Sequence, residues 1–171
     1  MTLSAIILAL VTLQRLGELL LARRNTTALL ARGAYEVGAA HYPLIVAVHA
    51  AWLVALWVFG RNQPVNLLAL AAFVALQAGR VWVLATLGAR WTTRIMILPG
   101  EARIVHGPYR FLSHPNYVIV IGEIALLPLA LNLPMLALIF TVLNAAALVV
   151  RIRAEARALS AADARRQHAV S

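Results

Sequence analysis

Apolar residues in this chain gather into long stretches that are separated by short segments carrying most of the charge. Five stretches stand out, at residues 3–22, 42–59, 64–87, 117–131 and 134–150. The first three are about 18–24 residues long, and about 20 apolar residues of helix cross the hydrocarbon core of a bilayer. The pattern therefore predicts an all-α integral membrane protein with five transmembrane helices in a single domain, residues 1–171.

The last two stretches are too short for an ordinary crossing. The fourth has about 15 residues, or roughly 22 Å of helix, against a hydrocarbon core of about 30 Å. Asn132 and Pro134 stand between the two stretches, and both residue types favour tight turns. We therefore expect a short helical hairpin whose cytosolic end starts below the headgroup level, with a cytosolic cofactor pocket in the resulting dip.

Composition agrees with a membrane protein and adds an orientation. The chain is 63% hydrophobic and only 12% charged, and all fifteen basic residues are Arg. Segments 23–41, 88–116 and 151–171 hold twelve of the arginines, whereas the loop on the other side holds only Arg61. The positive-inside rule then predicts an N-terminus outside and a cytoplasmic C-terminal tail, residues 151–171.

The same distribution limits the partners that the net charge of +9 suggests. The arginines lie in loops rather than in a stripe with exposed aromatic residues, so we expect no nucleic-acid partner. The chain has no cysteine, which excludes disulfides, a thiol nucleophile and cysteine metal ligands. No cluster with metal-ligand spacing is evident, and no metal is expected.

Charged and amide side chains interrupt two of the predicted spans. Gln14 and Glu18 share one face of the first span, where Arg15 can pair with Glu18; this group is a structural ion pair or the wall of a site. Arg80 lies within the third span, and a charged group at that depth requires a partner such as Glu18 or Glu123. Structural pairing and substrate orientation are both compatible with Arg80.

The segments between the spans carry further candidates. Glu36, His41 and Tyr42 are candidate pocket residues near the start of the second span. Within that span we expect His49 to face the bundle and Trp52 to belong to the core or to an interfacial belt. Residues 91–106 contain two apolar runs around Pro99 and Gly100, which suit a type II turn, so this segment is a short hairpin or an extended flap. It is either a plain connector or a lid.

The densest polar cluster is residues 106–123, HGPYRFLSHPNYVIVIGE. Pro115 suits the first turn of a helix, where its missing N–H costs nothing, so His114 marks the start of the fourth helix. The free N–H groups there attract acceptor groups of a ligand. Asn116 and Glu123 share one face that runs into the membrane. On the fifth helix, one face carries a second polar stripe, formed by Asn144, Arg151 and Glu155.

These motifs, GPYRFLSHPNY followed by a helical hairpin and RIRAEARAL, resemble the isoprenylcysteine carboxyl methyltransferase family, and the small bacterial branch in particular. The family pattern is close to G-x-Y-x-x-x-R-H-P-x-Y and then R-x-x-x-E-E-x-x-L. The chain matches it at Gly107, Tyr109, His114, Pro115, Tyr117, Arg151, Glu155 and Leu159. Ser113 replaces the usual Arg of the motif, and Ala156 replaces its second Glu.

The resemblance implies an S-adenosylmethionine-dependent O-methyltransferase in the bacterial inner membrane. Its substrate is a lipophilic or lipid-tailed molecule that enters from the bilayer, prenyl-like or of alkylpyrone or alkylresorcinol type, and accepts the methyl group on a carboxylate or an acidic hydroxyl. Arg151 is expected to orient the acceptor anion, with Glu123 or His41 as the base for a weaker acid. The residues expected to bind the cofactor are Tyr109, His114, Pro115, Asn116, Tyr117 and Glu155.

Two other readings remain open. Membrane sterol and steroid reductases also carry an R-H-P-N-Y-type motif and use NADPH, although their Glu follows the Tyr sooner than Glu123 does here. A non-enzymatic membrane scaffold or small transporter would use the same polar stripes to hold its helices together.

Overall fold

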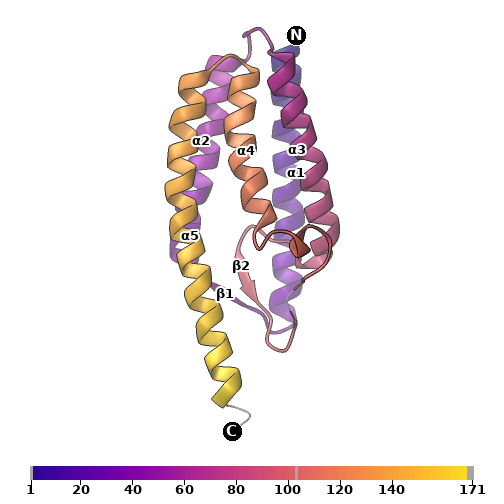
Figure 1. The fold of residues 1–171 in the computed structure, drawn as a ribbon, viewed down its shortest axis with the longest axis vertical. Coiled ribbons are helices and arrows are strands. Elements are labelled where there is room, and N and C mark those ends of the chain that lie inside the picture. Colours follow the sequence, from indigo (N-terminus) through magenta and orange to yellow (C-terminus); the bar gives the residue numbers. More distant parts are fainter. Residues whose placement is uncertain (1, 103, 169–171) are drawn as a thin grey trace.

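A computed structural model describes residues 2–102 and 104–168 of the chain, and only the backbone of residues 41 and 154–168. Five α-helices dominate this part of the chain (Figure 1). They are α1 (Leu3–Ala31), α2 (Tyr42–Gly60), α3 (Leu67–Leu87), α4 (Pro115–Ala130) and α5 (Pro134–His168). The prediction of an all-α fold with five helices is confirmed.

Four of these helices, α1, α2, α3 and α5, are long and apolar enough to cross a membrane, as expected for an integral membrane protein. α4 is the exception, with 16 residues, or about 24 Å of helix. It lies in the middle of the bundle in Figure 1 and packs against both α3 and α5. The short fourth helix predicted from the sequence is therefore confirmed. The prediction of a short fifth span is wrong, because α5 continues past residue 150 and its part Pro134–Arg153 is long and apolar enough to cross a membrane.

Two predicted helix ends needed correction. α1 continues well beyond residue 22, because the residues after Arg23 and Arg24 are mostly good helix formers and the helix ends only before Gly33, whose φ is +87°. α3 begins at Leu67 rather than at residue 64, because the Asn66 side chain caps it by accepting hydrogen bonds from two backbone N–H groups, each at 3.1 Å.

The turn between α4 and α5 is as tight as predicted. Asn132 has a positive φ of 54°, and the Leu133 N–H donates to the Pro128 carbonyl at 2.9 Å. The Asn132 side chain also donates to the carbonyl of Pro64 at 2.8 Å. This hydrogen bond ties the hairpin to the segment that leads into α3, at the end of the bundle where the N-terminus lies (Figure 1).

The opposite end of the bundle carries a two-stranded antiparallel sheet. Strand β1 (Tyr35–Val37) pairs with β2 (Ile95–Ile97), with Glu36 opposite Met96. Residues 91–106 therefore do not form a hairpin with themselves, because β2 takes its partner from the earlier loop instead. The alternative prediction, an extended flap, is the correct one, and Gly100 makes the expected turn with a φ of +83°.

The polar residues of α1, α3 and α4 form one buried ion cluster. The Arg80 guanidinium donates to both carboxylate oxygens of Glu18, each at 2.5 Å, and to Glu123 at 2.8 Å. Arg15 pairs with the same two carboxylates at 3.0 and 2.9 Å. Glu18 and Glu123 are thus the partners that the sequence predicted for Arg80. Two further members complete the cluster, the amides of Gln14 and Gln77.

Replacing Arg80 by Met removes the positive charge that lies between Glu18 and Glu123. Removing one partner of a buried ion pair costs about 3–5 kcal/mol, because a charge is left without compensation. Arg80→Met is therefore expected to lower the midpoint of thermal unfolding in detergent strongly. Arg23→Met, at an exposed position of α1, is the control and should change stability by about 0.5 kcal/mol or less. Equal midpoints for the two variants would contradict a stabilising role.

Candidate active site at the arginine-rich end

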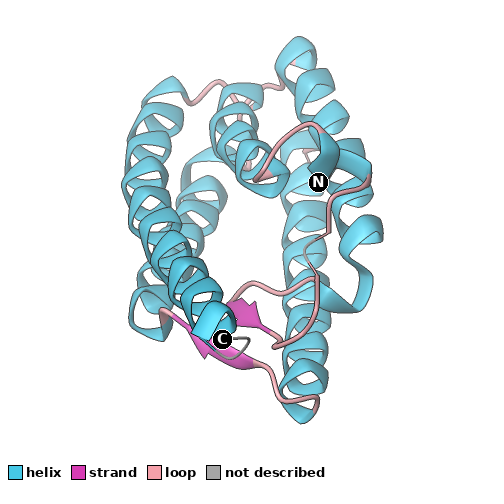
Figure 2. Cartoon of the chain, turned by 60° about the horizontal axis from the view of Figure 1, so that its bottom comes forward, coloured by secondary structure: helices cyan, strands magenta, loops and turns pink. Residues whose placement is uncertain are grey.

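The start of α4 faces the end of the bundle that holds the sheet and most of the loop arginines. Figure 2 brings this end forward and shows the two strands beside the part of α5 that leaves the bundle. Three parts of the chain meet here: the 88–114 connector with β2, the first turn of α4, and α5 around Arg151. This convergence is the place where the sequence predicted a site.

His114 occupies the N-cap position of α4, and Pro115 follows it within the first turn, as predicted. The imidazole makes no capping hydrogen bond. It stacks on the ring of Tyr117 instead, with 5.0 Å between ring centroids and 12° between the planes. The two stacked rings lie at the first turn of α4, where Pro115 has no N–H and the Tyr117 N–H donates to the His114 carbonyl at 3.1 Å.

Arg151 joins α5 to α4 and to the connector. Its Nε donates to the Tyr117 hydroxyl at 2.9 Å, and one Nη donates to the Thr93 carbonyl, also at 2.9 Å. The Thr93 hydroxyl lies 3.0 Å from the hydroxyl of Tyr42. A guanidinium has five N–H donors, so three remain without a partner among the residues that the structure describes.

The connector is anchored on both sides of Thr93. Arg94 pairs with Glu36 of β1 at 2.5 Å, and its guanidinium lies 4.5 Å from the centre of the Tyr42 ring. On the other side, the buried Asn25 side chain of α1 donates to the carbonyls of Gly88 and Trp91, at 3.1 and 2.8 Å. These contacts hold the Thr93 carbonyl, which accepts the hydrogen bond from Arg151, in a fixed position.

The structure separates one predicted catalytic residue from this group. Glu123 is 2% exposed and is held by Arg15 and Arg80 in the ion cluster, two helical turns beyond Asn116 along α4. Use of Glu123 as a base would require the cluster to open. The Asn116 side chain lies near the helix start, and its Oδ1 is buried with no hydrogen-bond partner among the described residues.

The remaining predicted site residues fall into two groups. Tyr109 is half-buried in a short 3-10 helix, Gly107–Arg110, that packs against α3. The side chains of His41 and Glu155 lie outside the described residues. Thr93 was missed by the sequence analysis, because it acts through its backbone carbonyl and no side-chain signal marks such a group.

A model of the isoprenylcysteine carboxyl methyltransferase (ICMT) family matches residues 67–161, more than half of the chain. The chain belongs to this family. The matched segment includes His114, Tyr117 and Arg151, whereas Glu36 and Tyr42 of the surrounding contacts lie outside it. ICMT-family proteins are membrane methyltransferases, so the family and the four long apolar helices agree.

Two relatives of this ICMT-family chain extend the likeness to the N-terminal helices. The uncharacterized protein YpbQ of Bacillus subtilis is 38% identical over 159 residues, which cover 90% of this chain and 95% of YpbQ. An uncharacterized protein of Haemophilus influenzae is 28% identical over 152 residues, which cover 85% of this chain and 88% of that protein. No solved structure matches the chain.

Glu36→Gln removes the charge that holds Arg94 and, through the connector, the Thr93 carbonyl. Because the two side chains are 21% and 39% exposed, the pair is worth at most about 1 kcal/mol. We expect amide hydrogens of β1 and β2 to exchange up to about fivefold faster in this variant, measured by mass spectrometry. Arg24→Gln, at an exposed position of α1, should leave exchange in the sheet unchanged. Unchanged exchange in both variants would exclude the pair as an anchor.

Proposed function

We propose that this ICMT-family protein transfers a methyl group from S-adenosylmethionine to a carboxylate or acidic hydroxyl oxygen of a lipophilic molecule. The observation that carries the proposal is the convergence of Arg151, Tyr117 and His114 at one end of an apolar bundle. All three belong to the segment that matches the family.

The residues at the start of α4 fit the cofactor. A purine ring and a ribose offer a flat surface and hydroxyl donors, which suit the stacked rings of His114 and Tyr117 and the unpaired Oδ1 of Asn116. Pro115 belongs to the same turn, and Glu155 follows Arg151 by one helical turn. Tyr109, in the 3-10 helix that packs against α3, is the remaining candidate. Bound there, S-adenosylmethionine supplies an electrophilic methyl group on a sulfonium.

Arg151 supplies the hydrogen-bond donors that an anionic acceptor requires. Its position is fixed by Tyr117 and Thr93, so its remaining donors hold an anionic oxygen in one place. Methyl transfer is an in-line displacement, and correct alignment of the reactants supplies up to about 7–11 kcal/mol of the barrier reduction. An acceptor that is already ionised needs no strong base. Glu123 and His41 remain candidate bases for a weaker acid.

The acceptor is proposed to arrive from the bilayer. Val118 of α4 and Val149 and Val150 of α5 are apolar and exposed next to the site. A lipid chain has the matching chemistry, since burial of apolar surface is favourable whatever the shape of the chain. The resemblance to the family implies the acceptor classes proposed, which are long-chain alkylpyrones, alkylresorcinols and prenyl-like acids.

The chain is proposed to lie in the bacterial inner membrane, with α4 as a fifth, short span and the sheet in the cytoplasm. The chain has no cysteine, so single cysteines report topology directly. In whole cells, a membrane-impermeant maleimide should label Asn62→Cys between α2 and α3. It should label Ser113→Cys, beside the site, only after permeabilisation. The reverse pattern would place the candidate site outside the cell and contradict the proposal.

Ligand-dependent thermal stability tests the cofactor. S-adenosylhomocysteine at 100 times its Kd should stabilise the purified protein by about 2.7 kcal/mol, because it binds only the folded state. NADPH should not stabilise the protein. Stabilisation by NADPH alone would favour a reductase, and stabilisation by neither ligand would favour a scaffold or transporter.

Arg151→Met tests the acceptor side separately. It should retain stabilisation by S-adenosylhomocysteine and lose most methyl transfer from labelled S-adenosylmethionine to a long-chain alkylpyrone or alkylresorcinol, because the anion loses its receptor. Arg153→Met, at an exposed position two residues further along α5, is the matched control and should keep full activity. Full transfer by Arg151→Met with normal cofactor binding would remove Arg151 from the mechanism.

A further inference from the structure

Polar groups without partners lie inside the bundle on α2 and α5, away from the site already described. The indole N–H of Trp52 and both amide atoms of Asn144 are buried and have no hydrogen-bond partner among the described residues. Trp52 is 3% exposed and Asn144 is 1% exposed. Because buried polar groups in native proteins are nearly always paired, such a set requires an explanation.

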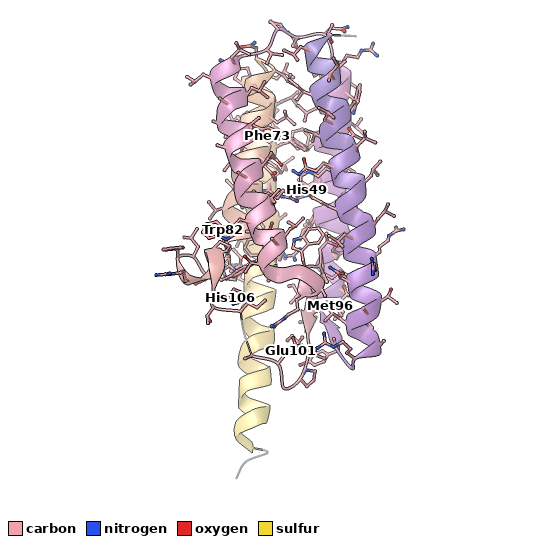
Figure 3. The ribbon with its side chains drawn as sticks, turned by 90° about the vertical axis from the view of Figure 1, so that its right-hand side faces the viewer. His49, Phe73, Trp82, Met96, Glu101 and His106 are labelled. Atoms are coloured by element: carbon pink, nitrogen blue, oxygen red, sulfur yellow. The ribbon has the colours of Figure 1, made fainter. Side chains whose placement is uncertain are left out.

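His49 adds an unpaired acceptor to the same region. Its Nδ1 lies 2.8 Å from the Ile45 carbonyl, and a carbonyl only accepts, so Nδ1 carries the hydrogen. In the neutral ring Nε2 then has a lone pair, and no described residue donates to it. Figure 3 shows His49 at mid-height of the bundle, in the interval between α3 and α1.

His49 and Asn144 lie at the same depth. Gly60, the last residue of α2, packs against Leu131 and Leu133 at the turn before α5, since a Cβ on Gly60 would lie 2.8 and 3.4 Å from their side chains. Eleven residues separate Gly60 from His49, and eleven separate Leu133 from Asn144. The two helices run in opposite directions away from this contact, so both residues lie about 16 Å from it.

The three side chains also occupy the inward faces of their helices. His49 is one turn from Trp52 on α2, and Asn144 is one turn from Phe140 on α5. Trp52 and Phe140 belong to one buried apolar cluster, and α2 packs against α5. The unpaired groups therefore lie on the inward faces of α2 and α5, which pack against each other. On the side of α1, α3 and α4, His49 is within electrostatic reach of Arg15, Arg80 and Glu123 of the ion cluster.

We propose that Trp52, His49 and Asn144 form a binding site for a neutral oxygen, a hydroxyl or carbonyl, carried partway along the apolar chain of the methyl acceptor. The inference rests on the proposed function only for the identity of the ligand as the acceptor. Asn144 shares one face of α5 with Arg151, seven residues further along, or about 10 Å. An acceptor whose reacting anion is held by Arg151 thus extends its chain toward these three groups.

The chemistry of the groups selects the ligand class. The indole of Trp52 and the amide nitrogen of Asn144 donate to an oxygen, and the amide oxygen of Asn144 and Nε2 of His49 accept from a hydroxyl. None of the three carries a charge to balance an ion. The Trp52 indole nitrogen and both Asn144 amide atoms are fully covered, whereas His49 is half-buried, so α2 and α5 must move apart slightly for a chain to reach Trp52 and Asn144. Hydrogen bonds to the oxygen of the ligand then satisfy these donors and acceptors.

Nuclear magnetic resonance of the indole N–H groups tests this site without methyl transfer. The chain has four tryptophans, so ¹⁵N-labelled protein in nanodiscs gives four indole signals, and Trp52→Phe assigns one of them. The probes are stearate and a hydroxystearate with its hydroxyl halfway along the chain. Both carry the same anionic end, and they differ by one neutral oxygen. The internal control is Trp57, whose indole already donates to Thr12 at 3.0 Å.

The hydroxystearate should shift the Trp52 signal in a saturable manner, whereas stearate should leave it nearly unchanged. The Trp57 signal should not move with either probe. Asn144→Leu, which is similar in size and removes both amide atoms, should reduce the affinity for the hydroxystearate at least tenfold and leave the response to stearate unchanged. Equal shifts with both probes, or an unchanged affinity in Asn144→Leu, would overturn the site.

These results separate the site from the proposed reaction. If S-adenosylhomocysteine fails to bind while the Trp52 signal still distinguishes the two probes, the methyltransferase proposal fails and the oxygen site stands. If methyl transfer occurs and neither probe moves the signal, the reaction stands and the site is excluded. With an active enzyme, Asn144→Leu should raise KM at least tenfold for a hydroxylated acceptor and leave both kcat and the affinity for S-adenosylhomocysteine unchanged.

Discussion

The Arg80 guanidinium lies where α1, α3 and α4 meet, and its bonds to Glu18 and Glu123 decide how those helices pack. Apolar surroundings hold helices together in many alternative registers, since one apolar face packs almost as well as another. An uncompensated charge in the same surroundings is expensive. A buried ion cluster is weak evidence for net stability, and its main effect here is specificity. One turn of slippage in any of the three helices would leave a charge without its partner.

That constraint sets the position of the candidate site. The ion cluster holds α4 at Glu123, and the turn at Asn132 holds its other end by a bond to the Pro64 carbonyl. The first turn of α4 is held by Tyr117, whose hydroxyl accepts from Arg151 of α5 at 2.9 Å. The two fixed points further along α4 set how far that turn extends toward the sheet. Arg151 of α5 meets that turn because α5 leaves the same tight hairpin, so its distance along the helix from the turn is fixed.

Sequence reasoning succeeded where a local rule or a physical necessity fixed the answer. Hydropathy located five helices, and the cost of a buried charge named both partners of Arg80. Sequence reasoning failed for features that depend on how distant segments meet in the folded chain. The charges at Arg23 and Arg24 end the apolar run but not the helix, because exposed arginine is a good helix former. The β1–β2 pairing joins segments 60 residues apart, and no turn signal connects them. No sequence pattern marks the role of the Thr93 carbonyl or the lack of hydrogen-bond partners for Asn144.

Polar residues inside the bundle thus follow two different rules. On α1, α3 and α4, the charged residues Arg15, Glu18, Arg80 and Glu123 pair with one another, which fixes the contacts between those helices. At the α2–α5 interface they are neutral and unpaired, and no side-chain hydrogen bond joins α2 to α5 among the described residues. Opening the first set would expose charges to an apolar medium, whereas α2 and α5 are joined by apolar contacts and, near the sheet, through the hydrogen bonds from Tyr42 to Thr93 and from Arg151 to Thr93. The proposed acceptor would therefore meet the least resistance between α2 and α5, on the face of α5 that leads to Arg151.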